Sequence, residues 1–254
     1  MTEPTEQQPL PPGPRAPEGN RLLMHICCGP CACICIRTLL AEGWNITGYF
    51  MNPNIQPLAE YLRRHEAAEQ TCAYFGIPIL FDDAAWNITD WLRAVQNRDT
   101  PPERCTYCVT SRMEATFTKA KEMGFTHFFS SLLYSKYQPH EAIRKAGERL
   151  SGQDGGPIFM YRDFRPYWQA GIDLSISMGI YRQPYCGCVY SETDRYHKKL
   201  DRLVKAQRQA EEARRQLPVY TLKTQKAVRC RAAFCVSRLL PPQKQSDSRR
   251  MAGI

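Results

Sequence analysis

Short apolar segments alternate with longer amphipathic segments along most of the chain. Apolar, β-branched and aromatic residues typical of buried strands gather at 21–26, 45–51, 77–81, 126–132 and 155–161. Between them, apolar residues recur at helical spacing, which predicts helices at 33–42, 58–75, 86–95, 107–123, 140–150 and 166–178. Strands that alternate with helices in this way indicate βαβ units. The pattern therefore predicts an α/β fold with a mostly parallel sheet and helices on both faces.

The two ends of the chain depart from this pattern. Residues 1–19 are polar and Pro-rich and lack the layout of a secretory signal, so we expect a disordered leader. From His197 to the end there are 15 Lys and Arg against four Asp and Glu, whereas the part before it is nearly neutral. We therefore expect an α/β catalytic domain at 20–197 and a basic helical extension with a flexible tail at 198–254.

The basic extension fits an acidic partner, and RNA fits it better than a membrane surface. Lys198 and Lys199 are its first candidate RNA contacts. Charge alone also allows a solvated helix with a frayed end. No apolar run approaches the roughly 20 residues of a membrane span, so we expect a cytoplasmic protein without a membrane partner.

The twelve cysteines change the picture, because a reducing compartment disfavours structural disulfides. Cys33, Cys35 and Cys72 lie in apolar helical contexts and are typical of buried free thiols. The other clustered cysteines stand in three short motifs, "HICCGPC", "RCTYC" and "YCGCVY", and are Cys27, Cys28, Cys31, Cys105, Cys108, Cys186 and Cys188. Two closely spaced pairs supply four sulfurs, enough for a zinc ion or an iron–sulfur cluster. Seven sulfurs exceed one closed zinc site, which favours a cluster with a second reactive centre, although structural zinc remains the alternative.

The first motif comes directly after the first predicted strand. Ligands of parallel sheets gather beyond the carboxyl ends of the strands, and the loops "NPNIQP" and "SSLLYSKYQPH" reach the same edge. Gly29 indicates a tight turn, and Pro30 stiffens the chain before the helix. Since a helix N-terminus stabilises negative charge, we expect ionised thiols here that act as ligands or redox groups.

The ordered motifs resemble the QueH family of epoxyqueuosine reductases. They are "LLMHICCGPC", "YFMNPNIQP", "EYLRR", "RCTYC…RMEAT", "SSLLYSKYQPHEAI", "FMYRDFRP" and "YRQPYCGCVYSE", over roughly residues 20–197. The resemblance implies a Rossmann-like, HUP-type fold, in agreement with the pattern. It also implies reduction of epoxyqueuosine to queuosine at the wobble position of tRNAs with a GUN anticodon. Members of the family use an iron–sulfur cluster and an adjacent metal, not cobalamin. For the electrons we expect an outside donor such as reduced ferredoxin or flavodoxin.

Carried over onto this chain, the resemblance matches all three cysteine motifs, and their division between the cluster and the second metal is our inference. We assign one set to a [4Fe–4S] cluster, namely Cys105, Cys108, Cys186 and Cys188. The other set, Cys27, Cys28 and Cys31, is assigned to an adjacent iron or other divalent metal. Two positions depart from the family pattern, since Lys136 stands where proline is expected and Asn87 where aspartate is expected. The segment after residue 200 lies outside the shared core.

Removal of an epoxide oxygen needs two electrons and two protons, and so a proton donor. Tyr134, His140 and Asp163 are candidates, because their loops are predicted at the ligand-binding edge. Each has a structural alternative, which is packing for the tyrosine, a helix cap for the histidine and an ion pair with a neighbouring arginine for the aspartate. Arg162 and Arg165 alternate with aromatic residues in "YRDFRPYW", a pattern that fits RNA recognition or plain core packing.

Three other functions remain to be compared. An ATP-dependent tRNA thiolase needs a Gly- or Ser-rich phosphate loop after the first strand, where "CCGPC" stands instead. A zinc-stabilised tRNA-binding module predicts a colourless protein with stoichiometric zinc. A thiol–disulfide reductase predicts mixed disulfides when one cysteine of a pair is replaced.

Overall fold

The computed structural model describes residues 15–17, 19–98 and 100–216. Its chain divides into two units, residues 1–196 and 197–254. Most of the expected leader and the expected flexible tail lie outside the described residues.

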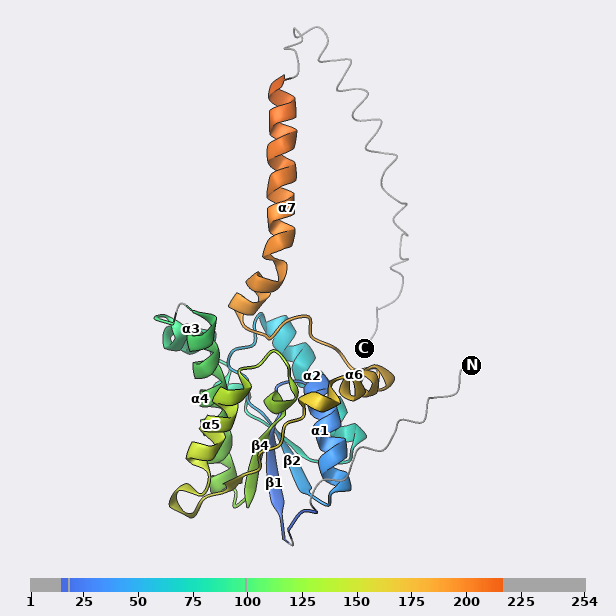
Figure 1. The fold of residues 1–254 in the computed structure, drawn as a ribbon, viewed down its shortest axis with the longest axis vertical. Coiled ribbons are helices and arrows are strands. Elements are labelled where there is room, and N and C mark those ends of the chain that lie inside the picture. The colour runs from blue at the N-terminus through green and yellow to red at the C-terminus, as the bar shows by residue number, and fades with distance from the viewer. Residues whose placement is uncertain (1–14, 18, 99, 217–254) are drawn as a thin grey trace, which may run out of the picture. The chain divides into compact units, whose positions relative to one another are not determined.

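Five parallel strands form the central sheet of the first unit (Figure 1). They are β1 (Arg21–His25), β2 (Asn45–Phe50), β3 (Ile79–Phe81), β4 (His127–Ser130) and β5 (Ile158–Phe159). Their order is β3-β2-β1-β4-β5, and Leu23 of β1 pairs with Thr47 of β2 and with Phe128 of β4. Four of the five residues of β1 are buried, and the middle three, Leu22, Leu23 and Met24, are apolar, as is typical of a central parallel strand. The predicted α/β fold is confirmed.

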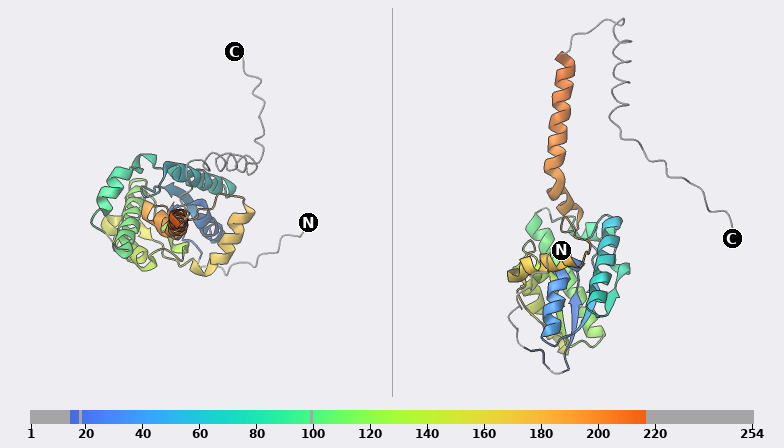
Figure 2. Two further views of the ribbon diagram at one scale, coloured as in Figure 1. Left: turned by 90° about the horizontal axis from the view of Figure 1, so that it is seen from above. Right: turned by 90° about the vertical axis from the view of Figure 1, so that its right-hand side faces the viewer.

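Helices cover both faces of this sheet, so the unit has three layers (Figures 1 and 2). On one side lie α1 (Gly29–Ala41), α2 (Leu58–Tyr74) and α6 (Trp168–Ser177), and on the other α4 (Pro101–Glu122) and α5 (His140–Leu150). The remaining helices are α3 (Ile88–Val95) and α7 (Val189–Gln216), with short 3-10 turns at Asp83–Ala85, Ser131–Tyr134, Gln153–Gly155 and Arg165–Tyr167.

The strand order changes direction at β1. The chain passes from β1 to β2 on one side, whereas β4 lies on the other side of β1. Such a switch leaves a crevice beyond the carboxyl ends of the two strands. There the backbone N–H of Cys27, after β1, donates to Ser131 Oγ, after β4, over 3.2 Å. The predicted convergence of these loops at one edge is confirmed.

Helix α4 begins at Pro101, six residues earlier than predicted. Thr100 and Glu103 form a reciprocal capping box, and the proline occupies a first-turn position that needs no N–H. The sequence analysis missed this start signal. Because the helix starts early, Cys105 and Cys108 lie on it three residues apart and share one face.

Helix α1 also begins earlier than predicted, at Gly29 instead of residue 33. The expected tight turn at this glycine is wrong. A Cβ built on Gly29 would lie 2.5 Å from the Ala67 carbonyl oxygen and 2.5 Å from Thr71 Oγ1. The glycine is required because α1 and α2 approach closely.

Gly29→Ala should therefore lower the free energy of unfolding by about 1–3 kcal/mol, the usual cost of an overpacked contact. The backbone carbonyl of Ala67 cannot rotate away as a side chain could. Urea denaturation followed by circular dichroism measures the change. An unaltered midpoint would show that α2 moves aside at no cost.

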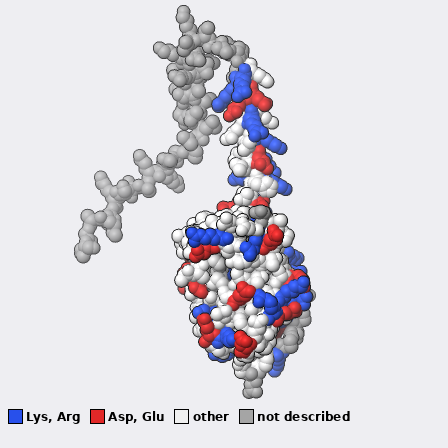
Figure 3. All heavy atoms as spheres, turned by 90° about the vertical axis from the view of Figure 1, so that its left-hand side faces the viewer, with Lys and Arg blue, Asp and Glu red and all other residues white. Residues whose placement is uncertain are grey.

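The second unit contains the part of α7 from His197 onward. This part carries seven Lys and Arg against three Asp and Glu, and no residue of α7 is buried (Figure 3). Within the described parts of the chain, no helix has the combined length and apolarity of a membrane span.

Candidate metal centre and adjoining cavity

The first group of cysteines is compact. Cys27 and Cys28 follow β1, and the first turn of α1 brings Cys31 back beside them, so that the three sulfurs lie within 4.8 Å of one another. The Cys27 and Cys28 sulfurs are 3.7 Å apart. A tetrahedral metal with metal–sulfur bonds of ~2.3 Å places its ligands about 3.8 Å apart. This group therefore has the spacing that a single metal ion needs.

The three thiols of this group differ in how readily they lose their protons. Hydrogen bonds from the Cys28 and Cys31 thiols hold the pKa of Cys27 well below its usual range. Burial raises the pKa of Cys28, and donation to Cys27 raises the pKa of Cys31. The directions of these shifts favour the negative charge on Cys27, and the expected ionisation of Cys28 and Cys31 stays a prediction for the metal-bound state. Coordination of a metal by all three sulfurs would release the protons still bound to them.

Polar side chains from two other segments fix these sulfurs. Ser131 Oγ lies 3.6 Å from Cys27 Sγ and donates to it. Gln183 Nε2 donates to Cys28 Sγ over 2.7 Å and lies 3.6 Å from Cys31 Sγ. Partners of this kind orient the ligands of a metal. Both residues stand inside motifs quoted above, but neither was singled out there.

His25 supports the same loop from inside the sheet. Its Nδ1 lies 2.9 Å from Ser130 Oγ and its Nε2 lies 3.2 Å from the Met51 carbonyl oxygen. Burial lowers the pKa of His25 to about 4, so the ring is neutral at pH 7. Because a carbonyl can only accept, Nε2 carries the proton and Nδ1 accepts from the Ser130 hydroxyl. The ring thereby ties the ends of β1, β2 and β4 together.

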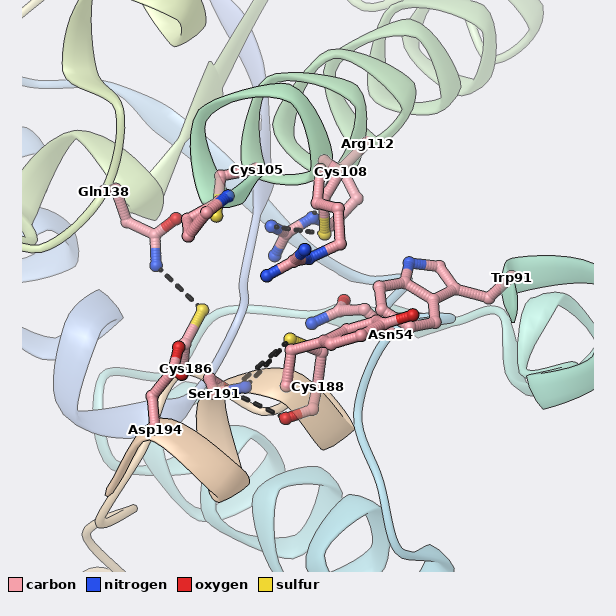
Figure 4. Close-up of a pocket in the computed structure, with 13 residues that line it drawn as sticks. Asn54, Trp91, Cys105, Cys108, Arg112, Gln138, Cys186, Cys188, Ser191 and Asp194 are labelled. Atoms are coloured by element: carbon pink, nitrogen blue, oxygen red, sulfur yellow. Dashed lines mark hydrogen bonds between the residues drawn. The ribbon is translucent and has the colours of Figure 1, made fainter. Parts of the chain in front are cut away.

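The second group of four cysteines lines one small cavity of about 50 Å³ (Figure 4). Cys105 and Cys108 reach it from α4, and Cys186 and Cys188 from the segment before α7. Gly187 between them has φ +133°, a conformation that favours glycine. Its carbonyl accepts from Gln56 N over 2.7 Å, which anchors this turn beside the loop after β2.

Each of three sulfurs in this cavity has a hydrogen-bond donor of its own (Figure 4). A guanidinium nitrogen of Arg112 lies 3.3 Å from Cys108 Sγ, Gln138 Nε2 lies 3.1 Å from Cys186 Sγ, and the backbone N–H of Ser191 lies 3.4 Å from Cys188 Sγ. Burial raises the pKa of Cys108 to about 11 and also raises that of Cys105. These donors stabilise thiolates against the cost of burial.

The four sulfurs are spaced more widely than the first three. Among the described residues, only Cys27, Cys28 and Cys31 bring three ligand atoms within 4.8 Å of one another. Four thiols around one cavity at a larger spacing suit a multi-atom centre better than a single ion. In the same cavity wall, the indole nitrogen of Trp91 and the amide oxygen of Asn54 are buried and have no hydrogen-bond partner in the part of the chain that the structure describes. The residues present therefore fit an iron–sulfur cluster.

A larger cavity of about 640 Å³ adjoins both groups. Cys27 and Cys31 line it on one side, and Cys186 belongs to its wall as well as to that of the small cavity. Its volume is in the range of small-molecule sites. Aromatic and basic side chains make up much of the remaining wall, among them Tyr134, Tyr137, Trp168, Arg182, Tyr185 and Arg195.

Comparison with known proteins identifies the family of this chain. The family profile described as "Epoxyqueuosine reductase QueH" matches residues 22–194. The chain belongs to the QueH family. It is therefore an enzyme of the oxidoreductase class, and the resemblance of its motifs to this family is confirmed.

Curated relatives agree with the family profile. The chain is 37% identical over 184 residues to the epoxyqueuosine reductase QueH of Haemophilus influenzae, a match that covers 70% of this chain and 74% of the relative. It is 35% identical to the protein of that name from Acinetobacter baylyi (69% and 82% covered). With the one from Thermotoga maritima it shares 32% identity (70% and 93% covered).

Among the three candidate proton donors of this QueH chain, Tyr134 lines the larger cavity. Its hydroxyl donates to the Trp168 carbonyl oxygen over 2.7 Å, and burial raises the pKa of Tyr134. His140 and Asp163 line neither cavity; their Nε2 and Oδ1 atoms lie 3.5 Å apart. Asp163 also binds Arg165 over 2.6 Å, which lowers the pKa of that carboxyl group.

The candidate RNA contacts are likewise dispersed. Arg162 is an ion-pair partner of Glu42 and covers the rings of Phe164 and Tyr167, so it serves packing. Arg165 is paired with Asp163. Lys198 and Lys199 are exposed on the part of α7 that belongs to the second unit. Their role in RNA binding stays a prediction.

The departures from the QueH pattern have local explanations. Asn87 Oδ1 accepts from the backbone N–H groups of Thr89 and Asp90 and so caps α3, which asparagine and aspartate do about equally well. Lys136 Nζ lies 5.6 Å from the centre of the Trp168 ring. The lone thiols are buried as expected, and burial raises the pKa of Cys33 and of Cys72 to about 12.

Proposed function

We propose that this protein reduces the epoxide of epoxyqueuosine to the alkene of queuosine at the wobble position of tRNAs with a GUN anticodon. One observation carries this proposal beyond family membership. Both cysteine groups open onto the same 640 Å³ cavity, through Cys27 and Cys31 on one side and Cys186 on the other. A substrate in that cavity would touch both groups at once.

The two cysteine groups would hold different cofactors. We assign the four widely spaced sulfurs to a [4Fe–4S] cluster and the compact trio to an adjacent iron or other divalent metal. When bound, such groups supply electrons one at a time and a Lewis acid for an epoxide oxygen. Reduced ferredoxin or flavodoxin would be the electron donor, and cobalamin would take no part.

The overall reaction requires the protein to supply two electrons and two protons to the substrate. Both carbon–oxygen bonds of the epoxide break, a carbon–carbon double bond forms, and the oxygen leaves as water after uptake of two electrons and two protons. Of the three candidate donors, Tyr134 stands in the cavity wall. It would exchange its bond to the Trp168 carbonyl for one to the substrate oxygen. His140 and Asp163 would act through intervening water.

The mouth of the larger cavity offers contacts for RNA. Tyr137 is 85% exposed and lies edge-on to Trp168, which in turn stacks on Tyr134. Unstacked bases bind to such aromatic faces, and Arg182 and Arg195 in the same wall can reach phosphates. We therefore propose this wall for recognition of the anticodon loop, in place of Arg162. Lys198 and Lys199 would add affinity that falls with rising salt.

The test uses purified protein loaded with ferrous iron and sulfide without air. The protein is incubated with tRNA that carries epoxyqueuosine and with reduced flavodoxin, and nucleosides are measured by mass spectrometry. Conversion to queuosine is expected, with loss of activity in Cys105→Ala. A colourless protein that holds stoichiometric zinc and converts nothing would instead favour the zinc-stabilised RNA-binding module. Mixed disulfides in single-cysteine variants would favour a thiol–disulfide reductase.

A further inference from the structure

Trp91 presents a buried hydrogen-bond donor to the four-cysteine cavity. The residue is 5% exposed, on α3, and its Nε1–H has no hydrogen-bond partner among the described residues. Figure 4 shows the indole extending from α3 toward the space between Cys108 and Cys188. A buried N–H group without an acceptor is costly, and native proteins rarely leave one. The position points to an acceptor inside the cavity.

Two neighbouring residues, Arg112 and Asn54, indicate that this acceptor is negatively charged. Arg112 is 3% exposed and lines the same cavity, and no ion pair with a carboxylate is found for it in the described part of the chain. Asn54 is 1% exposed, and a half-turn of its amide would present NH₂ to the cavity instead of the unpaired Oδ1. The buried Arg112 cation beside the unpaired indole N–H of Trp91 fits an anion that accepts hydrogen bonds, and the Asn54 amide could supply a further donor once turned.

An iron–sulfur cluster offers such acceptors, because its inorganic sulfides protrude between the cysteine ligands. Hydrogen bonds to these sulfurs stabilise the reduced, more negative form over the oxidised form. A single zinc ion at this site would present only the cysteine sulfurs, and three of these already have donors in Arg112, Gln138 and Ser191. With zinc, the indole N–H would have to share one of these sulfurs or reach Cys105, and no inorganic sulfide would be present to accept it.

We propose that Trp91 Nε1–H donates a hydrogen bond to a sulfur of the cluster held by the four cysteines and thereby raises the cluster's reduction potential. The inference rests on the proposed function, since that function supplies the cluster. It assigns a tuning role to α3, which carries none of the seven cysteines.

Trp91→Phe removes the N–H and keeps an aromatic ring against Tyr190, whose ring centre lies 6.2 Å from that of Trp91. The matched control is Trp86→Phe, because Trp86 Nε1 donates to the Ile55 carbonyl oxygen over 2.8 Å and does not line the cavity. Protein loaded with iron and sulfide is titrated without air and followed by electron paramagnetic resonance. At a fixed solution potential, the ratio of reduced to oxidised cluster should fall about tenfold in Trp91→Phe, which corresponds to about 59 mV for one electron.

A fully loaded Trp91→Phe with the wild-type midpoint would overturn the inference while leaving the proposed function intact. Wild-type protein that takes up zinc but no iron and sulfide would overturn both. A second measurement does not depend on the variant holding a cluster. In wild-type protein labelled with ¹⁵N at the indole nitrogen, pulsed paramagnetic resonance of the reduced cluster should detect one coupled ¹⁵N. Absence of any coupling would contradict the hydrogen bond.

Discussion

Cys108→Ala is expected to strip the protein of iron and acid-labile sulfide and to lower the rate of epoxide reduction by more than about 100-fold. Cys108 is buried on α4 and lines the four-cysteine cavity, where its sulfur is held by a guanidinium nitrogen of Arg112 at 3.3 Å. A methyl group in its place leaves three sulfurs for the cluster and the arginine without its partner. Iron and sulfide assays together with the visible spectrum measure the loss.

Cys72→Ala is the matched control, because Cys72 is also a buried thiol and lines neither cavity. It should keep wild-type iron, sulfide and activity, at a modest cost in stability. Equal iron and sulfide in both variants would show that Cys108 is not a ligand, and the division of the seven cysteines would then need to be redrawn.

Arg112→Met is expected to lower the midpoint potential of the loaded protein by roughly 100 mV. Arg112 is a buried cation whose Nε donates to the Cys108 carbonyl over 2.9 Å and whose neighbouring negative groups are Cys108, Cys186 and Cys27. A unit charge a few ångströms away contributes about 2–4 kcal/mol in a medium of effective dielectric constant near 20, and 1.4 kcal/mol corresponds to 59 mV for one electron. Methionine keeps much of the volume and removes the charge.

Arg112→Lys separates charge from geometry, since it retains the cation but cannot form both bonds to Cys108. Its midpoint should lie closer to wild type than that of Arg112→Met. Redox titration of all three proteins, each normalised to bound iron, makes the comparison. Identical midpoint potentials in the wild type and both variants would mean that another group, and not Arg112, balances the negative charge of the thiolates.

Hydrophobic periodicity predicted the sheet and most helices because the central strands β1, β2 and β4 are largely buried and every strand contains a short apolar run. It placed the start of α4 wrongly because "PPERCTYC" has no apolar repeat, and the helix begins there through the capping of Thr100 and Glu103. The hydrophobic pattern could not predict the order of the strands, because that order depends on how the helices that connect the strands pack on the sheet.

The cysteine groups were predictable because their short spacings are visible in the sequence. Their partners were not. Arg112 and Gln183 stand inside the quoted motifs and Trp91 outside them, but nothing in the sequence singles these residues out, and they become cavity groups only after α3, α4 and the segment before α7 assemble. Arg162 illustrates the converse, because its aromatic surroundings looked like an RNA-binding pattern whereas its charge is used by Glu42.

Cys186 lines both cavities, and this position would expose a cluster bound there to air. The residue is exposed, and any small oxidant that enters the larger cavity reaches its sulfur without crossing the protein. An anticodon loop seated in that cavity would cover the same sulfur. Binding of substrate would then also shield the centre from dioxygen, and an enzyme of this design would be most vulnerable between one tRNA and the next.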